Sequence, residues 1–205
     1  MKKNLSIIIG IIFVIAIITI SMNMENKTKA EPKVLLMSGK HQVAMTFKDY
    51  GTVTLELDGD EAPTTVSHFI DLVKSGFYDG LTIHRVHKDF VIQGGDPEGN
   101  GTGGAERNVV GEFKANNYNN NISHTRGTIS MARNSSDMNS ASSQFFIVLK
   151  DSTYLDGQYA GFGHVIDGMD IIDKINKDKA KYAINEMGLL SKVDQVTIEK
   201  VKVLN

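Results

Sequence analysis

Short β-prone segments separated by glycine, asparagine and serine fill the middle of the chain, and they restrict the possible folds more than any other feature. The clearest are FVIQG, GTISMA, SQFFIVL and AGFGHVI, all between Leu81 and Ile166. Such spacing indicates turns between strands, whereas parallel strands need long crossover connections that are usually helices. The pattern therefore favours an antiparallel barrel or sandwich over an α/β fold.

A β-hairpin is predicted ahead of these segments. Apolar and polar residues alternate over residues 43–47 and again over residues 53–57. Asp49, Tyr50 and Gly51 lie between the two runs. Period-two alternation around a turn that contains aspartate and glycine is typical of two paired strands with one face buried.

The segment APTTVSHFIDLVKSG predicts an amphipathic helix. Apolar side chains recur at helical spacing over residues 66–73, and Gly76 follows as a stop signal. Pro63 suits the first turn of a helix. Thr64 or Thr65 is the predicted cap.

The C-terminal part combines a second helix with a last strand. In GMDIIDKINK, apolar residues fall at helical spacing. The final VDQVTIEKVKVLN alternates at Val196 and Ile198 and again at Val201 and Val203. The parity changes around residues 199–200, which predicts a β-bulge.

A strongly apolar run lies near the N-terminus. Residues 5–20 contain no charged side chain, and Lys2 and Lys3 precede them. This arrangement is typical of a secretory signal or a membrane anchor. With Ser21–Met24 added, a helix over residues 5–24 would be about 30 Å long, the thickness of a bilayer core.

The same region sets the predicted location and the domain boundaries. An anchor is favoured over a cleaved signal, because the first suitable small residues, Thr28 and Ala30, lie well beyond the apolar run. The lysines place the N-terminus inside and the rest outside, so an extracytoplasmic, membrane-anchored protein is expected, with secretion after cleavage as the alternative. We predict a signal anchor or signal peptide over residues 1–24, a polar tether over residues 25–40 and one domain over residues 41–205.

Composition excludes several classes of function. Residues 31–205 hold 18 basic and 23 acidic side chains, so no nucleic-acid-binding surface is expected. The chain contains no cysteine, which excludes disulfides, a thiol nucleophile and a thiolate metal site.

The stretch IHRVHKDFVIQGGD raises the possibility of a metal site. His84 and His87 are three residues apart with Arg85 between them, in a segment that resembles strand and loop. The helical zinc motif has a four-residue step and a glutamate, and a nearby cation disfavours a divalent ion, so no metal is expected. His68, beside the apolar stripe of the first helix, is interpreted as a surface or packing residue.

Two further motifs carry little weight. The stretch from Gly99 to Gly104 fits GxGxxG, but it lacks the strand–turn–helix setting of a dinucleotide site and is interpreted as a surface loop. The chain has no GxSxG elbow for a nucleophilic serine.

Five blocks together resemble the cyclophilin-type peptidyl-prolyl cis-trans isomerases: HRVHKDFVIQGGD, GNGTGG, GTISMA, SSQFFI and YLDGQYAGFG. They occur in the order of that family, and the similarity covers roughly Val43 to Val203. The resemblance implies a mainly β fold: a closed eight-stranded antiparallel β-barrel capped by two α-helices. It also implies an isomerase that needs no cofactor and acts on proline-containing polypeptides.

The resemblance assigns roles to individual residues. Arg85 takes the place of the catalytic arginine, Gln93 of the glutamine that orients it, and Phe90 completes the catalytic set. The matches to the apolar pocket for the proline ring are Phe90, Val91, Phe146 and Leu155. The matches to the rest of the substrate groove are Gly101, Ala132, Arg133, Asn134, Gln144, Tyr154 and Tyr159.

This chain also departs from the family pattern. Val91 is smaller than the methionine that is common there, and Ser142 stands where glycine is usual. Tyr154 and Tyr159 fall where the family often has tryptophan and histidine. Tyr154 resembles bacterial-type members and implies weak or no tight binding of cyclosporin.

These residues suit the isomerisation of a peptide bond. Rotation about an amide has a barrier of about 18–20 kcal/mol, because lone-pair density on nitrogen is delocalised into the carbonyl. A fixed guanidinium that donates to that nitrogen only in the twisted state would lower the barrier. A chaperone that binds proline-containing segments without catalysis is the alternative, and a metal-dependent hydrolase built on the two histidines is a remote one.

Overall fold

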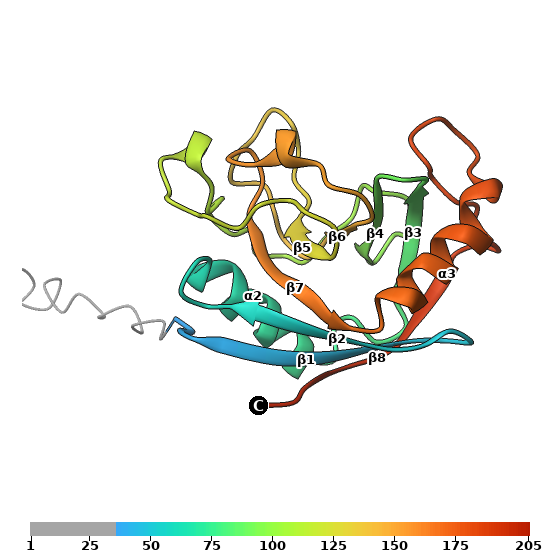
Figure 1. Ribbon diagram of the computed structural model, residues 1–205, viewed down its shortest axis with the longest axis horizontal. Coiled ribbons are helices and arrows are strands. Elements are labelled where there is room, and N and C mark those ends of the chain that lie inside the picture. The colour runs from blue at the N-terminus through green and yellow to red at the C-terminus, as the bar shows by residue number, and fades with distance from the viewer. Residues whose placement is uncertain (1–35) are drawn as a thin grey trace, which may run out of the picture. The chain divides into compact units, whose positions relative to one another are not determined.

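The computed structural model describes residues 36–205. Eight strands form a closed barrel in the order β1-β2-β7-β5-β6-β4-β3-β8 (Figure 1). All neighbouring strands are antiparallel. The strands are β1 (Lys40–Phe47), β2 (Gly51–Asp58), β3 (Thr82–His87), β4 (Val91–Asp96), β5 (Thr128–Met131), β6 (Phe145–Val148), β7 (Gly161–Asp167) and β8 (Val196–Val203). The predicted fold, a closed eight-stranded barrel with two helices, is confirmed.

Two α-helices cover the barrel. Helix α2 (Pro63–Lys74) contacts β2 and β8, and helix α3 (Met169–Lys179) contacts β2 and β3. Figure 1 shows the two helices toward opposite sides of the barrel. Three short 3-10 turns lie in the connections, at Lys114–Asn116, Thr153–Leu155 and Ala180–Tyr182.

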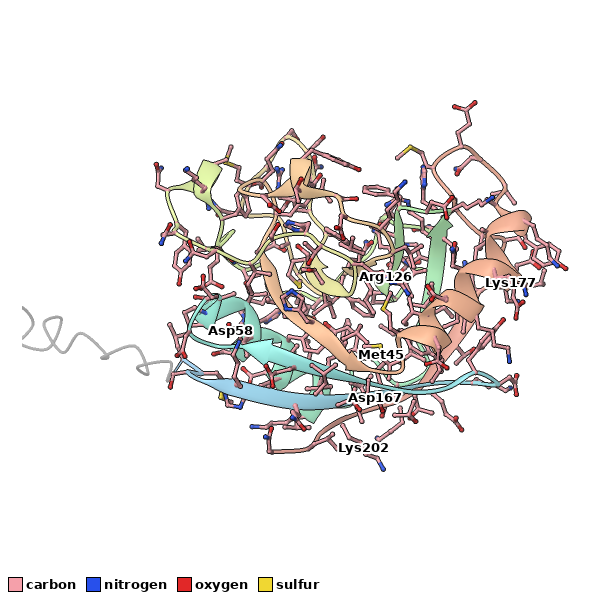
Figure 2. The ribbon with its side chains drawn as sticks, in the orientation of Figure 1. Met45, Asp58, Arg126, Asp167, Lys177 and Lys202 are labelled. Carbon is pink, nitrogen blue, oxygen red and sulfur yellow. The ribbon has the colours of Figure 1, made fainter. Side chains whose placement is uncertain are left out.

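The predicted hairpin of β1 and β2 forms one wall of the core. Val43 faces Leu55 and Met45 faces Val53 across the pair, and all four are fully buried. Burial of each such side chain contributes about 1.5–3 kcal/mol. Figure 2 shows Met45 in the interior, whereas Lys202 of β8 points away from it.

The change of parity in β8 is a bulge, as predicted. Thr46 pairs with Lys200 and Phe47 pairs with Ile198, so Glu199 is the extra residue on β8. The bulge lets both Ile198 and Val201 face the core, although they are three residues apart.

The start of α2 corrects one prediction. Pro63 occupies the first turn as expected, but the cap position is Ala62 and neither Thr64 nor Thr65 caps the helix. Instead, the carboxylate of Glu112 accepts hydrogen bonds from the amides of Thr64 and Thr65, both at 2.8 Å, and from the Thr65 hydroxyl at 2.7 Å. A side chain 47 residues away therefore provides the anionic cap that the first turn favours.

The folded unit begins earlier than predicted. The Met37 amide donates to Ser67 Oγ at 2.7 Å, and β1 begins at Lys40. Residues 36–40 of the predicted tether therefore pack with the domain. The predicted anchor lies outside the described residues. Within residues 36–205, no helix has the length and apolar character needed to cross a bilayer.

Four histidines make the stability of this fold sensitive to mild acid. Burial lowers the pKa of each below its ordinary value of 6.5: His68, His84, His124 and His164. Each is protonated more readily in the unfolded chain, so its contribution to stability is complete above about pH 6.5 and is lost as the pH falls through the folded value. Asp96 and Asp156 have pKa values lowered from 3.8, so they stay ionised over this window.

We therefore expect Tm to be constant from about pH 8.5 to pH 7.5 and to fall by several degrees by about pH 5. Circular dichroism melts at a fixed scan rate and ionic strength measure it. A flat Tm down to about pH 5 would contradict the prediction, because only histidines change charge over that range.

Candidate active site

The register of four neighbouring strands places two of the three predicted catalytic residues, Arg85 and Gln93, in one row, whereas Phe90 precedes β4. Arg85 of β3 pairs with Gln93 of β4, Gln93 pairs with Phe146 of β6, and Phe146 pairs with Ser130 of β5. The adjacent row, Val86, Ile92, Ile147 and Ile129, belongs to the barrel core. Because side chains alternate between the two faces of a sheet, the Arg85 row lies on the outer face of the barrel.

Two hydrogen bonds hold the Arg85 guanidinium. Nε donates to the carbonyl oxygen of Met187 at 2.6 Å, and Nη1 donates to Gln93 Oε1 at 2.8 Å. Within residues 36–205, Nη2 has no hydrogen-bond acceptor. Burial lowers the pKa of Arg85 below its ordinary value and Tyr159 partly offsets this, but arginine remains charged at neutral pH.

Two glutamine amides continue this network in a defined direction. Gln93 Nε2 donates to Gln144 Oε1 at 2.9 Å, and Gln144 Nε2 donates to the carbonyl of Gly103 at 2.7 Å. Since arginine can only donate, Gln93 must present its oxygen to Arg85 and its nitrogen to Gln144. The orientation of both amides follows from the arginine.

Beside the guanidinium lies a small cavity of about 230 Å³, here called the apolar cavity. Its lining residues are Arg85, Phe90, Val91, Gln93, Ala132, Arg133, Phe146, Leu155, Tyr159 and Met187. Val91, Phe146 and Leu155 belong to a hydrophobic cluster separate from the barrel core. The cavity is thus a largely apolar recess whose lining also includes the guanidinium-bearing side chains of Arg85 and Arg133.

A buried histidine supports the aromatic wall of the apolar cavity. The His124 ring stacks on Phe146, with centroids 6.0 Å apart and planes 21° apart. His124 Nδ1 lies 2.8 Å from the Asp156 carboxylate and Nε2 lies 3.0 Å from Ser130 Oγ. Phe146 also meets Tyr159 edge-to-face at 5.7 Å. These contacts fix the position of the Phe146 ring.

A second cavity of about 410 Å³, here called the polar cavity, adjoins the first. Its lining residues are Gln93, Gly101, Thr102, Gly103, Ala132, Arg133, Asn134, Ser140, Ser142 and Gln144. Gln93, Ala132 and Arg133 line both cavities. An extended polypeptide could therefore occupy the two cavities in succession.

The glycine-rich stretch is a loop, as predicted, and its residues Gly101, Thr102 and Gly103 line the polar cavity. Asp96 holds it by accepting hydrogen bonds from the amides of Glu98, Asn100 and Gly101 at 2.8, 3.0 and 2.6 Å. Burial opposes ionisation of Asp96, but these amides lower its pKa below the ordinary value. Gly101 has φ of 92°, a conformation that favours glycine.

His68 is a packing residue that supports the other side of the polar cavity. Its Nε2 lies 2.7 Å from the carbonyl oxygen of Ser142, and Nδ1 lies 2.8 Å from Arg107 Nη2. Because arginine can only donate, Nδ1 accepts the hydrogen bond from Arg107. Nε2 therefore carries the ring proton and donates a hydrogen bond to the Ser142 carbonyl oxygen. The interpretation of His68 as a packing or surface residue thus resolves in favour of packing.

The structure brings all but one of the predicted site residues to the two cavities. The exception is Tyr154, which is 64% exposed and lines neither cavity. Its ring stacks on Phe90 with centroids 6.1 Å apart. Tyr154 thus contacts a lining residue without lining a cavity itself.

Sequence reasoning missed several lining residues. Thr102 and Gly103 belong to the GNGTGG motif and Ser142 to SSQFFI, so these motifs could have indicated them, whereas Ser140 lies in neither. No sequence motif indicated Met187. Its contact to Arg85 is made by the backbone carbonyl, and no pattern of side chains predicts a backbone contact.

The two histidines of the IHRVHKDFVIQGGD stretch, His84 and His87, differ in environment. His84 is 1% exposed, and neither ring nitrogen has a hydrogen-bond partner among the described residues. The His87 ring meets Phe90 edge-to-face at 5.3 Å. Within residues 36–205, no three histidine or acidic side chains gather as a metal site would require.

Comparison with known proteins agrees with this arrangement. Residues 42–203 match the family model described as "Cyclophilin type peptidyl-prolyl cis-trans isomerase/CLD". The chain is 41% identical over 140 residues to peptidyl-prolyl cis-trans isomerase-like 1 of Rhizopus delemar, covering 68% of this chain and 82% of that protein. It is 44% identical over 129 residues to a peptidyl-prolyl cis-trans isomerase of Helicobacter pylori, covering 62% of this chain and 76% of that protein.

A solved structure supports the same grouping. A cyclophilin-type isomerase of Cryptosporidium parvum, crystallised in the presence of the dipeptide Ala-Pro, superposes with a TM-score of 0.69 at 28% identity. The superposition covers 80% of this chain and 99% of that chain.

Proposed function

The chain belongs to the cyclophilin-type peptidyl-prolyl cis-trans isomerase family and is an isomerase of that type. From this premise we propose that it accelerates the folding of exported proteins and that Arg85 is the catalytic residue. The observation that carries the proposed mechanism is the guanidinium: two bonds immobilise it and Nη2 stays without an acceptor among the described residues. A fixed donor next to an apolar recess suits a reaction that changes no covalent bond.

In the proposed mechanism, the apolar cavity holds the proline ring while the preceding carbonyl rotates. At the top of the barrier the amide is twisted, and its nitrogen becomes pyramidal and regains a lone pair. Arg85 donates to that lone pair, which is available only in the twisted state, so the interaction stabilises the transition state selectively. Phe90, Phe146 and Leu155 exclude water, which strengthens this hydrogen bond.

The glutamine network supplies a prediction of its own. Gln144→Leu leaves Gln93 Nε2 without its acceptor and frees the Gln93 amide to rotate away from Arg85. We expect kcat/KM for an Ala-Pro peptide to fall about tenfold, measured by NMR exchange. Gln42→Leu on β1, outside both cavities, is the matched control and should leave the rate unchanged. A wild-type rate in Gln144→Leu would show that the network does not position Arg85.

A chaperone that binds proline-containing segments without turnover is the alternative. A refolding experiment distinguishes the isomerase from the chaperone. It uses an exported protein whose slow refolding phase is proline isomerisation, which takes tens of seconds or more without catalysis. Catalytic amounts of an isomerase should shorten that phase, and Arg85→Ala should abolish the effect. A binder would change the yield of folded protein without shortening the phase.

The apolar run of residues 5–24 and the two lysines before it support action outside the cytoplasm, in association with the membrane. In bacterial cells that express the full chain, protease added to spheroplasts should cleave the domain, while a cytoplasmic marker survives. Ile12→Lys with Ile15→Lys interrupts the run and should retain the domain inside. A protected wild-type domain would refute this location, and recovery from the medium would favour secretion over anchoring.

A further inference from the structure

A short hairpin that follows α3 completes the wall of the site around Arg85. β3 pairs with β8 only at Thr82 and Ile83. Beyond them, the Val86 amide donates to Gly188 O and the Leu190 amide donates to His84 O, both at 2.8 Å. Residues 188–190 therefore cover the edge of β3 that β8 leaves open (Figure 1).

The turn of this hairpin approaches β3 very closely. Gly188 has φ of 85°, and a Cβ there would lie 2.6 Å from the Val86 carbonyl oxygen and 2.8 Å from the His87 nitrogen. The Asn185 carbonyl accepts from the Gly188 amide at 3.0 Å, and the Asn185 side chain accepts from the Leu189 amide at 3.1 Å. The backbone of the turn is thus held on both sides, which fixes the Met187 carbonyl against Arg85.

The Met187 side chain has a different environment from its carbonyl. It is 62% exposed, yet it lines the apolar cavity and not the polar one. A polypeptide with its proline in the apolar cavity would place one flank in the polar cavity and pass Met187 with the other. An unbranched thioether adapts to apolar groups of different shape.

We propose that Met187 is a specificity-determining residue: its thioether receives an apolar side chain of the client on the flank of the proline remote from the polar cavity. The carbonyl of the same residue positions Arg85, so one turn couples client preference to the catalytic donor. This inference rests on the proline-binding role proposed for the apolar cavity.

The test compares two series of peptides of the form Ala-Ala-Xaa-Pro-Yaa-Ala, in which either Xaa or Yaa is glycine, alanine, leucine or phenylalanine. For the full-length protein in detergent, NMR exchange measures kcat/KM for each. We expect wild type to prefer leucine and phenylalanine in one series. Met187→Ala should lower kcat/KM for those peptides about 3- to 10-fold more than for the glycine peptides, mainly through KM. Met187→Leu should restore the preference.

Ile184→Ala is the matched control, because Ile184 is 63% exposed on the same hairpin but lines neither cavity. It should change none of the rates. Equal losses for all peptides in Met187→Ala, no loss at all, or the same losses in Ile184→Ala would overturn the proposal. If wild type accelerated no peptide, the proposed function itself would fail, which is a distinct result.

Discussion

Arg85→Lys is expected to lower kcat/KM for an Ala-Pro peptide by about 100-fold or more, while the fold is retained. Lysine keeps the charge but has one nitrogen in place of a planar fork. It cannot bond the Met187 carbonyl and Gln93 Oε1 and still donate to the substrate from a fixed position. The loss should appear mainly in kcat, because the interaction forms only with the twisted amide.

Arg126→Lys is the matched control for this change. Arg126 also makes two guanidinium hydrogen bonds, to Leu149 O at 2.9 Å and to Asp173 at 2.6 Å, but it lines neither cavity. We expect its turnover to equal that of wild type. NMR exchange gives the rates and a thermal melt verifies folding for both variants. Near-wild-type turnover in Arg85→Lys would refute the proposed mechanism.

Glu112→Ala is expected to be the most destabilising of the substitutions considered, at about 3 kcal/mol. Glu112 is 2% exposed, and its carboxylate satisfies two amides of the first turn of α2 and the hydroxyl of Thr65. Removal leaves the buried Thr65 donors and the part-buried Thr64 amide without their acceptor, and it takes an anion from the positive end of the helix. A domain of this size should lose roughly 6–12 °C in Tm.

Two further variants separate the contributions. Glu112→Gln keeps an acceptor but removes the charge, so its loss should be about half as large. Glu106→Ala changes an exposed glutamate of the same loop region, with no side-chain hydrogen bond among the described residues, and should be neutral within about 0.5 kcal/mol. Denaturant titration with a constant m-value measures each change. Equal stability of Glu112→Ala and Glu106→Ala would show that Glu112 does not cap α2.

Much of the barrel could be predicted from local patterns. The alternation in β1, β2 and β8 records which side chains face the core, because each strand has one buried face. The bulge at Glu199 was visible for the same reason: the apolar positions change parity there. The resemblance to the family then identified most lining residues of both cavities, since these positions lie inside or next to its sequence motifs.

Contacts between distant segments were decided only by the tertiary structure. The cap of α2 comes from Glu112, and no periodicity around Thr64 or Thr65 indicates a carboxylate so far away in the chain. Tyr154 matches a site position in sequence, yet it lines neither cavity: its side chain is 64% exposed and its ring stacks on Phe90.

The sequence by itself determined the pattern of core-facing residues in β1, β2 and β8 and predicted the candidate site residues, because hydrophobicity and hydrogen-bonding capacity are properties of side chains. The tertiary structure alone decided how Arg85 is held. Its Nε bonds the backbone of Met187, 102 residues away, and a backbone carbonyl is the same in every residue. Its position depends on the path of the whole chain, here on the close approach of Gly188 to β3.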